Sequence, residues 1–156
     1  MVCSAKSAFI DQSDLEMLAF LRKNARQTLT KISKETGIPI SSTFDRLKRL
    51  EGIGIIRSYT SIFDWEKVGF HTRVVILLKT RDNIKDTLEC WLKEYRHINN
   101  LMRINGEWNF VAEALFRDIK SLEEFMESLS ENFEGIQSSV NYVLEDIKRE
   151  GFTPEL

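Results

Sequence analysis

The sequence is poor in cysteine, proline and glycine, and it has no long apolar run. Of its 156 residues, two are cysteines, two are prolines and seven are glycines. The cysteines, Cys3 and Cys90, are too few for a disulfide framework and form no Cys-x-x-Cys metal motif. The longest apolar run, residues 74–78, is far short of the roughly 20 residues that span a bilayer. Residues 1–9 lack the apolar segment of a secretory signal. We therefore expect a cytoplasmic protein with no membrane partner.

Charge is unevenly divided along the chain, although the net charge is only −2. The first 60 residues contain ten basic and six acidic residues, a net charge of +4. The remainder contains twelve basic and eighteen acidic residues, a net charge of −6. Such an asymmetry indicates that only the first part meets a polyanion such as a nucleic acid. Chance clustering of charges is the alternative explanation.

Helical spacing and capping signals predict three helices in the first 60 residues. Asp11 and Asp14 have the spacing of a capping pair at the start of the first helix, and Thr28 can cap the second. The Gly-Ile-Pro sequence at residues 37–39 is a stop signal, and a third helix is predicted over residues 41–51. The inward stripes of the first two helices are Leu15, Leu18, Leu21 and Ala25, then Leu29, Ile32 and Thr36.

Beyond the third helix, predicted strands and helices alternate. Residues 55–63 are rich in β-branched and aromatic side chains and predict a strand, followed by a connector over residues 64–70. Further strands are predicted at residues 72–80, 98–104, 108–116 and 138–147, with Asn105 and Gly106 as a hairpin turn signal. The intervening helix stripes are Ile84, Leu88, Trp91, Leu92 and Tyr95, then Leu122, Phe125, Met126, Leu129 and Phe133. The resulting β-α-β-β-α-β order is ferredoxin-like, with both helices on one face of the sheet. We expect a second subunit to cover the other face.

The third predicted helix carries the pattern that most directly indicates a function. Phe44, Leu47 and Leu50, with Ile40 just before the helix, are predicted to face inward. An amphipathic helix with small hydroxyls at its start and arginines along its length is typical of a helix that enters the major groove of DNA. We predict DNA contacts from the residues of the outward face and its flanks: Ser41, Ser42, Thr43, Asp45, Arg46, Lys48 and Arg49. A solvated face on a small helical bundle is the alternative.

Four segments of the first half resemble the Lrp/AsnC ("feast/famine") family of transcription regulators. They are IDQSDLEML at residues 10–18, NAR at 24–26, ISKETGIP at 32–39 and RLKRLEGIGII at 46–56. The second half is similar to the family's β-α-β-β-α-β ligand-binding domain. The resemblance implies binding to pseudo-palindromic double-stranded DNA, a homodimer formed through the C-terminal sheets, often assembly into tetramers or octamers, and often an amino-acid effector.

The predicted fold class is therefore α+β, with an N-terminal winged-type helix-turn-helix and a C-terminal ferredoxin-like βαββαβ domain. The expected division is residues 1–54 for the DNA-binding domain, 55–71 for a strand and linker, and 72–156 for dimerisation and ligand binding.

The family's effector site includes a turn of the form Gly-x-Tyr-Asp. Here the turn is Gly106, Glu107, Trp108 and Asn109, so tryptophan and asparagine replace tyrosine and the acid. The resemblance also implies that Ser138 and Ser139 lie near hydroxyl-bearing ligand positions on the last strand. An ordinary hairpin turn and a solvated strand start are the alternative.

Two other functions stay open at this point. One is a non-specific architectural DNA-binding protein. The other is an enzyme similar to siroheme decarboxylases, which share this scaffold and use histidines beside a tetrapyrrole. His71 and His97 have no partner at metal-ligand spacing, and no phosphate loop or catalytic triad is present. We therefore predict no catalytic residue, no metal and no cofactor.

Overall fold

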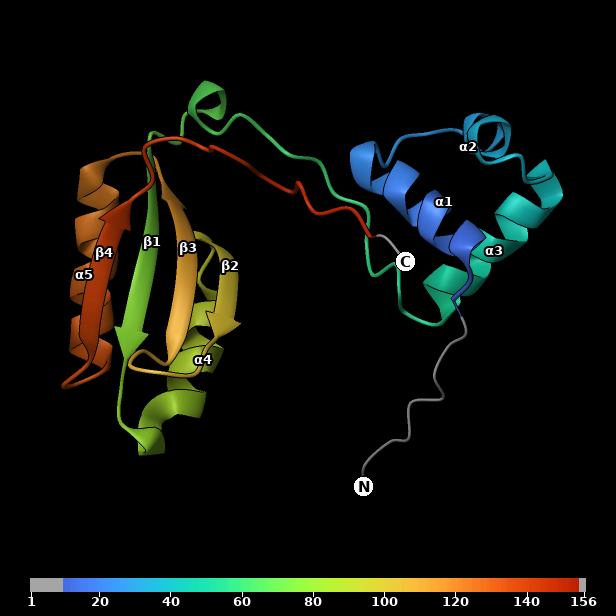
Figure 1. Cartoon of the computed structure of the whole chain (residues 1–156). Coiled ribbons are helices and arrows are strands. Elements are labelled where there is room, and N and C mark those ends of the chain that lie inside the picture. The colour runs from blue at the N-terminus through green and yellow to red at the C-terminus, as the bar shows by residue number, and fades with distance from the viewer. Residues whose placement is uncertain (1–9, 155–156) are drawn as a thin grey trace. The chain divides into compact units, whose positions relative to one another are not determined.

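The computed structural model describes residues 10–154 and divides them into two compact units (Figure 1). Residues 10–62 and 148–154 form the N-terminal unit, and residues 63–147 form the C-terminal unit. The division falls inside the predicted linker, but residues 148–154 belong with the first unit. Cys3 lies outside the described residues, and Cys90 is an exposed free thiol. Among the described residues, no helix combines the length and the apolar character needed to cross a membrane.

Three helices make up the N-terminal unit: α1 (Gln12–Lys23), α2 (Leu29–Thr36) and α3 (Ile40–Gly52). The predicted caps are confirmed. The N–H of Asp14 donates to the Asp11 carboxylate over 2.9 Å, and the N–H of Asp11 donates to Asp14 over 3.1 Å. Thr28 accepts from the N–H of Lys31 over 3.2 Å. The small core of the unit contains Met17, Ile32 and Leu47.

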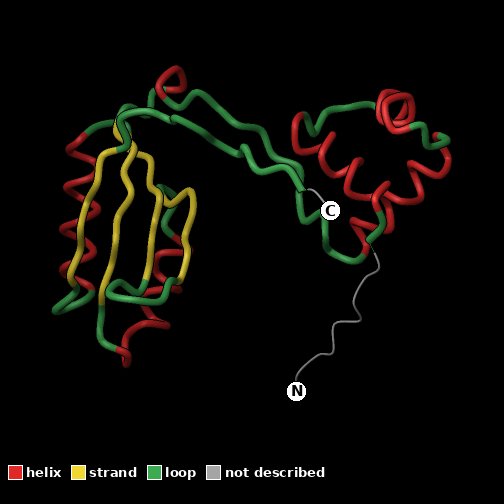
Figure 2. The backbone as a smooth tube through the Cα atoms, viewed as in Figure 1, coloured by secondary structure: helices red, strands yellow, loops and turns green. Residues whose placement is uncertain are grey.

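The strand predicted over residues 55–63 is absent, and that prediction is wrong. The backbone of this segment forms no strand and joins no sheet (Figure 2). A strand exists only when a neighbouring strand accepts and donates its backbone hydrogen bonds. The β-forming side chains of this segment favour an extended chain, but its backbone is paired with none of the four strands described.

The C-terminal unit has the predicted β-α-β-β-α-β order. Its elements are β1 (Thr72–Lys79), α4 (Lys85–Glu94), β2 (Ile98–Arg103), β3 (Phe110–Phe116), α5 (Ile119–Asn132) and β4 (Gln137–Tyr142), with short 3-10 turns at Glu66–Val68 and Asp82–Ile84. The four strands form one antiparallel sheet in the order β2-β3-β1-β4. The last strand ends five residues earlier than predicted. Tyr142 pairs with Val74 near the start of β1, so the residues after it have almost no strand left to pair with.

Both helices of this unit lie on one face of the sheet, and the other face carries no helix (Figures 1 and 2). Side chains of β1 alternate between buried and half-buried, because successive residues point to opposite faces. The helix-covered face supplies the core, which includes Ile76, Leu88, Phe110, Phe125 and Leu129. The helix-free face therefore bears the half-buried residues of β1.

Candidate nucleic-acid interface

The turn between α2 and α3 is fixed by its backbone and by two hydroxyl groups. Gly37 ends α2 in the left-handed conformation, with φ of +70°, which costs glycine nothing and other residues about 1–2 kcal/mol. Thr43 is buried, and its hydroxyl donates to the Pro39 carbonyl over 3.1 Å. The Ser33 hydroxyl donates to the Ile38 carbonyl. These contacts hold α3 at one angle to α2, which is the requirement for a helix-turn-helix.

The face that α3 presents to solvent differs from the predicted one. Thr43, Leu47 and Leu50 are buried and form its inward stripe. Phe44, expected inside, is 47% exposed, and Ile40 is 49% exposed. The outward face also carries Ser41, Asp45 and Lys48, all exposed, while Ser42 and Arg46 are half-buried at its margin. Successive helix residues are about 100° apart, so placing Thr43 inward turns Phe44 outward.

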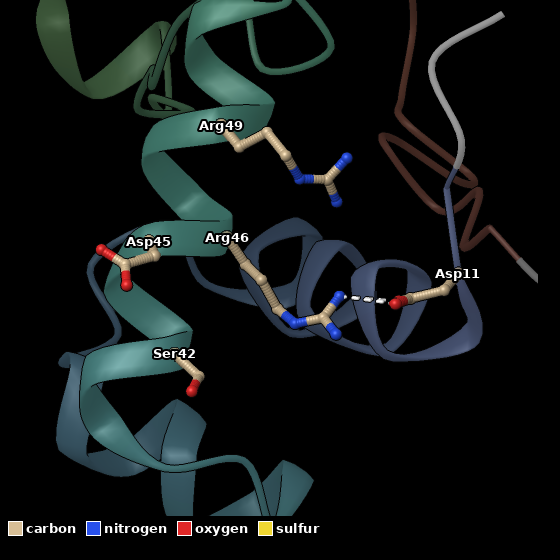
Figure 3. Close-up of a pocket in the computed structure, with 5 residues that line it drawn as sticks. All are labelled: Asp11, Ser42, Asp45, Arg46 and Arg49. Carbon is tan, nitrogen blue, oxygen red and sulfur yellow. Dashed lines mark hydrogen bonds and ion pairs between the residues drawn. The ribbon is translucent and has the colours of Figure 1, made fainter.

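Arg46 and Arg49 extend from α3 toward the acids at the start of α1. The Arg46 Nη1 atom lies 2.7 Å from a carboxylate oxygen of Asp11 and 2.8 Å from one of Asp14. Arg49 also forms an ion pair with Asp14. We call these four residues the Asp14 cluster. In Figure 3 both arginines point to the side on which Asp11 lies, whereas Asp45 points away from it. An open hollow of about 510 Å³ lies over this region, lined by Asp11, Ser42, Asp45, Arg46 and Arg49.

Asp14 stays ionised despite its burial. Its side chain is only 1% exposed, and burial alone would raise the pKa of its carboxyl group. Hydrogen bonds from Arg49 and Arg46, with one from the Asp11 N–H, outweigh burial and lower the pKa of Asp14 below its ordinary value. The arginines keep partial exposure, 30% for Arg46 and 40% for Arg49. The Asp14 cluster therefore fixes α3 against α1 and partly neutralises both arginines.

Other cations surround the helix-turn-helix. Lys48 on α3 is 63% exposed and forms a 3.2 Å ion pair with Glu51. Lys31 and Lys34 on α2 are exposed, and no ion pair is recorded for either within residues 10–154. In a helix-turn-helix the first helix of the motif crosses the DNA backbone and the second enters the groove. Lysines on α2 and a lysine on the outer face of α3 match those two tasks.

The segments predicted to bind an effector lie at one end of the C-terminal sheet. The side-chain oxygen of Asn109 accepts from the Thr80 N–H over 2.8 Å, and the Asn109 N–H donates to the Leu78 carbonyl over 2.8 Å. Asn109 thus ties the hairpin turn to the end of β1. Gly106 has φ of +116°, a conformation that a side chain would strain, and Glu107 is exposed while Trp108 is half-buried.

Ser138 and Ser139 also lie near this end of the sheet, but they point to opposite faces. Ser138 pairs with the buried Leu78, and Ser139 pairs with the half-buried Leu77. Because side chains alternate along a strand, only one of the two serines can face a given ligand.

Comparisons with known proteins agree with both units. Residues 10–57 match the winged helix-turn-helix DNA-binding family, and residues 73–151 match the Lrp/AsnC ligand binding domain. The chain belongs to the Lrp/AsnC family. It is a transcriptional regulator of the Lrp/AsnC type with a helix-turn-helix DNA-binding domain.

Named relatives of this Lrp/AsnC regulator are themselves called transcriptional regulators. An uncharacterized HTH-type regulator of Pyrococcus horikoshii is 30% identical over 152 residues, which is 94% of this chain and 98% of that protein. The HTH-type regulator Ptr1 of Methanocaldococcus jannaschii is 32% identical over 118 residues, 75% of this chain and 79% of Ptr1. A Neisseria meningitidis transcriptional regulator, solved in complex with L-methionine, has a TM-score of 0.83, 24% identity, and coverage of 90% and 94% of the two chains.

Two features of this Lrp/AsnC chain are not predicted from the sequence. The pairing of Asp14 with Arg46 joins residues 32 positions apart, and the exposure of Phe44 depends on which neighbour fills the core. The sequence does contain a signal for the ion pair, because the acids at Asp11 and Asp14 and the bases of the third helix can each be seen in it. Only the packing of α1 against α3 brings them together.

Proposed function

We propose that this chain binds DNA in a sequence-specific way, with α3 in the major groove of the duplex. The observation that carries the proposal is the outward face of α3, on which Ser41, Asp45 and Lys48 are exposed. The turn that precedes this helix is held in place by the hydrogen bond from Thr43 to Pro39. Hydroxyls can bond to any base edge, a carboxylate accepts from the cytosine amino group, and lysine pairs with guanine or phosphate. Lys31 and Lys34 on α2 supply phosphate contacts, which give affinity and salt dependence.

The remaining predicted contacts take different proposed roles. Ser42 contacts DNA from the margin of the face. Arg46 and Arg49 mainly position α3 through the Asp14 cluster, and their partly exposed side chains add long-range attraction for phosphate. Thr43 is buried and bonded within the turn, which argues against the DNA contact predicted for it.

We further propose that two copies pair through the helix-free face of the sheet. Val75, Leu77 and Val111 are half-buried apolar residues on that face. The charged Glu113 on the same face is already paired, with Arg73 at 2.6 Å and with Asn99 at 3.0 Å. A partner can therefore cover this face without stranding a buried charge. A dimer offers two copies of α3 to successive major grooves of pseudo-palindromic DNA, and tetramers or octamers would extend the array.

An amino acid is the proposed effector. The support is the hairpin turn at residues 106–109 and the likeness to a regulator solved with L-methionine. The exposed Glu107 can accept from an ammonium group, and one of Ser138 and Ser139 can donate to a carboxylate. Asn109 is committed to Thr80 and serves as a brace. A ligand alters regulation only when it favours one assembly over another.

We also propose a cytoplasmic location and no catalytic role for this DNA-binding regulator. The alternative, an enzyme on the same scaffold, requires a bound tetrapyrrole. A purified protein that carries a visible absorption band and ignores DNA would favour that alternative.

The test is footprinting on the protein's own promoter, together with selection of bound sequences from random duplexes. A few protected sites and one selected sequence support the proposal, whereas uniform protection favours an architectural protein. The Lys48→Ala variant should bind every duplex more weakly. Lys93→Ala is its matched control, since Lys93 is 62% exposed and also pairs with a glutamate, but lies in the other unit. Equal DNA binding by the two variants would show that Lys48 does not contact DNA and would contradict the proposed placement of α3.

A further inference from the structure

Two large apolar side chains stand on the outer face of α3. Ile40 and Phe44 are 49% and 47% exposed, and they are four residues apart, so they lie one above the other on the helix. Both occupy the first half of α3, which runs from Ile40 to Gly52. In a helix-turn-helix, the N-terminal residues of the second helix are the ones that reach base edges. The exposed apolar pair is therefore placed where bases are read.

The surroundings of Phe44 suit a DNA groove. The Lys48 Nζ atom lies 5.9 Å from the centroid of the phenyl ring, and the exposed Ser41 and Asp45 flank it on the same face. A cation beside the ring and polar groups around it make a small apolar spot within a polar surface. The floor of the major groove is complementary, because it is polar apart from the C5-methyl groups of thymine.

We infer that Phe44, with Ile40 beside it, contacts thymine methyl groups in the bound DNA and thereby determines part of the sequence choice. The inference rests on the proposed DNA binding and names the residue and the chemical group that discriminate. Apolar contact is the way in which phenylalanine distinguishes thymine in the major groove. Lys48, by contrast, contributes to binding whatever the sequence.

The experiment replaces single thymines by deoxyuridine, which lacks only the methyl group. The duplex is the sequence selected by the full-length wild-type protein from random DNA, and binding is measured by fluorescence anisotropy. At one or two thymines in each half-site, deoxyuridine should weaken wild-type binding about three- to fivefold, the effect of one buried methyl group. The Phe44→Ala variant should bind the thymine and deoxyuridine duplexes equally. Phe44→Leu should keep the preference, and Lys48→Ala should keep it at lower affinity.

The outcomes separate this inference from the proposed function. If selection yields no preferred sequence, sequence-specific binding fails and the inference fails with it. If a sequence is selected but no deoxyuridine matters, or the preference survives in Phe44→Ala, only the inference is overturned. The other possible partner of Phe44 is a second copy of the chain. Light scattering on Phe44→Ala tests this, because it measures the size of the assembly. Loss of assembly with unchanged methyl preference would assign Phe44 to a protein contact and overturn the inference.

Discussion

Replacing Asp14 by asparagine should destabilise the N-terminal unit by about 2–3 kcal/mol. The carboxylate is 1% exposed and accepts from both Arg46 and Arg49. A hydrogen bond to a charged group contributes about 1.5–3 kcal/mol. The two arginines are 30% and 40% exposed, so water can solvate them once the carboxylate is gone. We therefore expect the loss of both hydrogen bonds to cost less than twice the value for one bond. With a urea m-value of about 1–2 kcal/mol/M, the midpoint should fall by about 1–3 M.

The two units give separate signals for this measurement. The three tryptophans, Trp65, Trp91 and Trp108, all lie in the C-terminal unit, whereas circular dichroism reports helices in both. Asp14→Asn should lower the circular dichroism midpoint and leave the tryptophan fluorescence midpoint in place. Asp45→Asn is the matched control, because it removes the same charge from an exposed carboxylate and should cost under about 0.5 kcal/mol. Equal midpoints for Asp14→Asn and Asp45→Asn would refute the structural role of the Asp14 cluster.

The stability difference between wild type and Asp14→Asn should depend on pH, in the direction set by the lowered pKa of Asp14. The folded pKa of Asp14 is below its ordinary value, so the charged form is favoured by folding. Its contribution to stability is complete above the ordinary aspartate pKa of about 3.9 and disappears as the pH falls through the lower, folded value. The gap between wild type and Asp14→Asn should therefore be constant near neutral pH and close in acid. A gap that widened in acid would contradict this assignment.

Other substitutions probe the remaining features. Lys48→Ala should lower the slope of log affinity against log salt by about 1, measured by anisotropy over a salt series, and an unchanged slope would place Lys48 away from phosphate. Gly37→Ala should cost about 1–2 kcal/mol in urea denaturation followed by circular dichroism, through φ of +70° alone because nothing lies within 4 Å of the added carbon. Gly52→Ala, in equally open space without positive φ, should be neutral or stabilising. Asn109→Ala should lower the stability of the C-terminal unit by about 1 kcal/mol by tryptophan fluorescence, since the Thr80 N–H loses its acceptor, whereas Asn109→Asp should keep it.

Much of the fold can be predicted because its signals are local. A capping side chain such as Asp11 bonds three residues away, and a helix stripe such as that of Leu122, Phe125 and Leu129 needs only the helical period. The predicted strand at residues 55–63 is wrong because strand formation needs a partner that composition does not specify. The last strand ends early for the same reason, at the point where β1 begins.

The candidate site is less accessible to sequence reasoning. The amphipathic pattern of the sequence locates α3. Thr43 and Phe44 are adjacent, however, and the pattern places the larger, apolar Phe44 in the core. The structure buries Thr43, because its hydroxyl bonds to the Pro39 carbonyl in the turn. Likewise the arginines on α3 resemble free DNA contacts until the packing of α1 brings Asp14 against them.

The Asp14 cluster has a consequence for how tightly one subunit can hold DNA. It partly neutralises two of the ten positive charges in the first 60 residues, so the field that a phosphate meets is weaker than those ten basic residues alone would produce. We therefore expect a single helix-turn-helix of this kind to hold DNA less tightly than one whose arginines are unpaired. Occupancy of the DNA site would rise steeply when several helix-turn-helix units are linked in one assembly. Once the first unit is bound, the second binds at a high effective concentration. In the assembly proposed above, the number of linked helix-turn-helix units would therefore set how long the protein stays on its DNA.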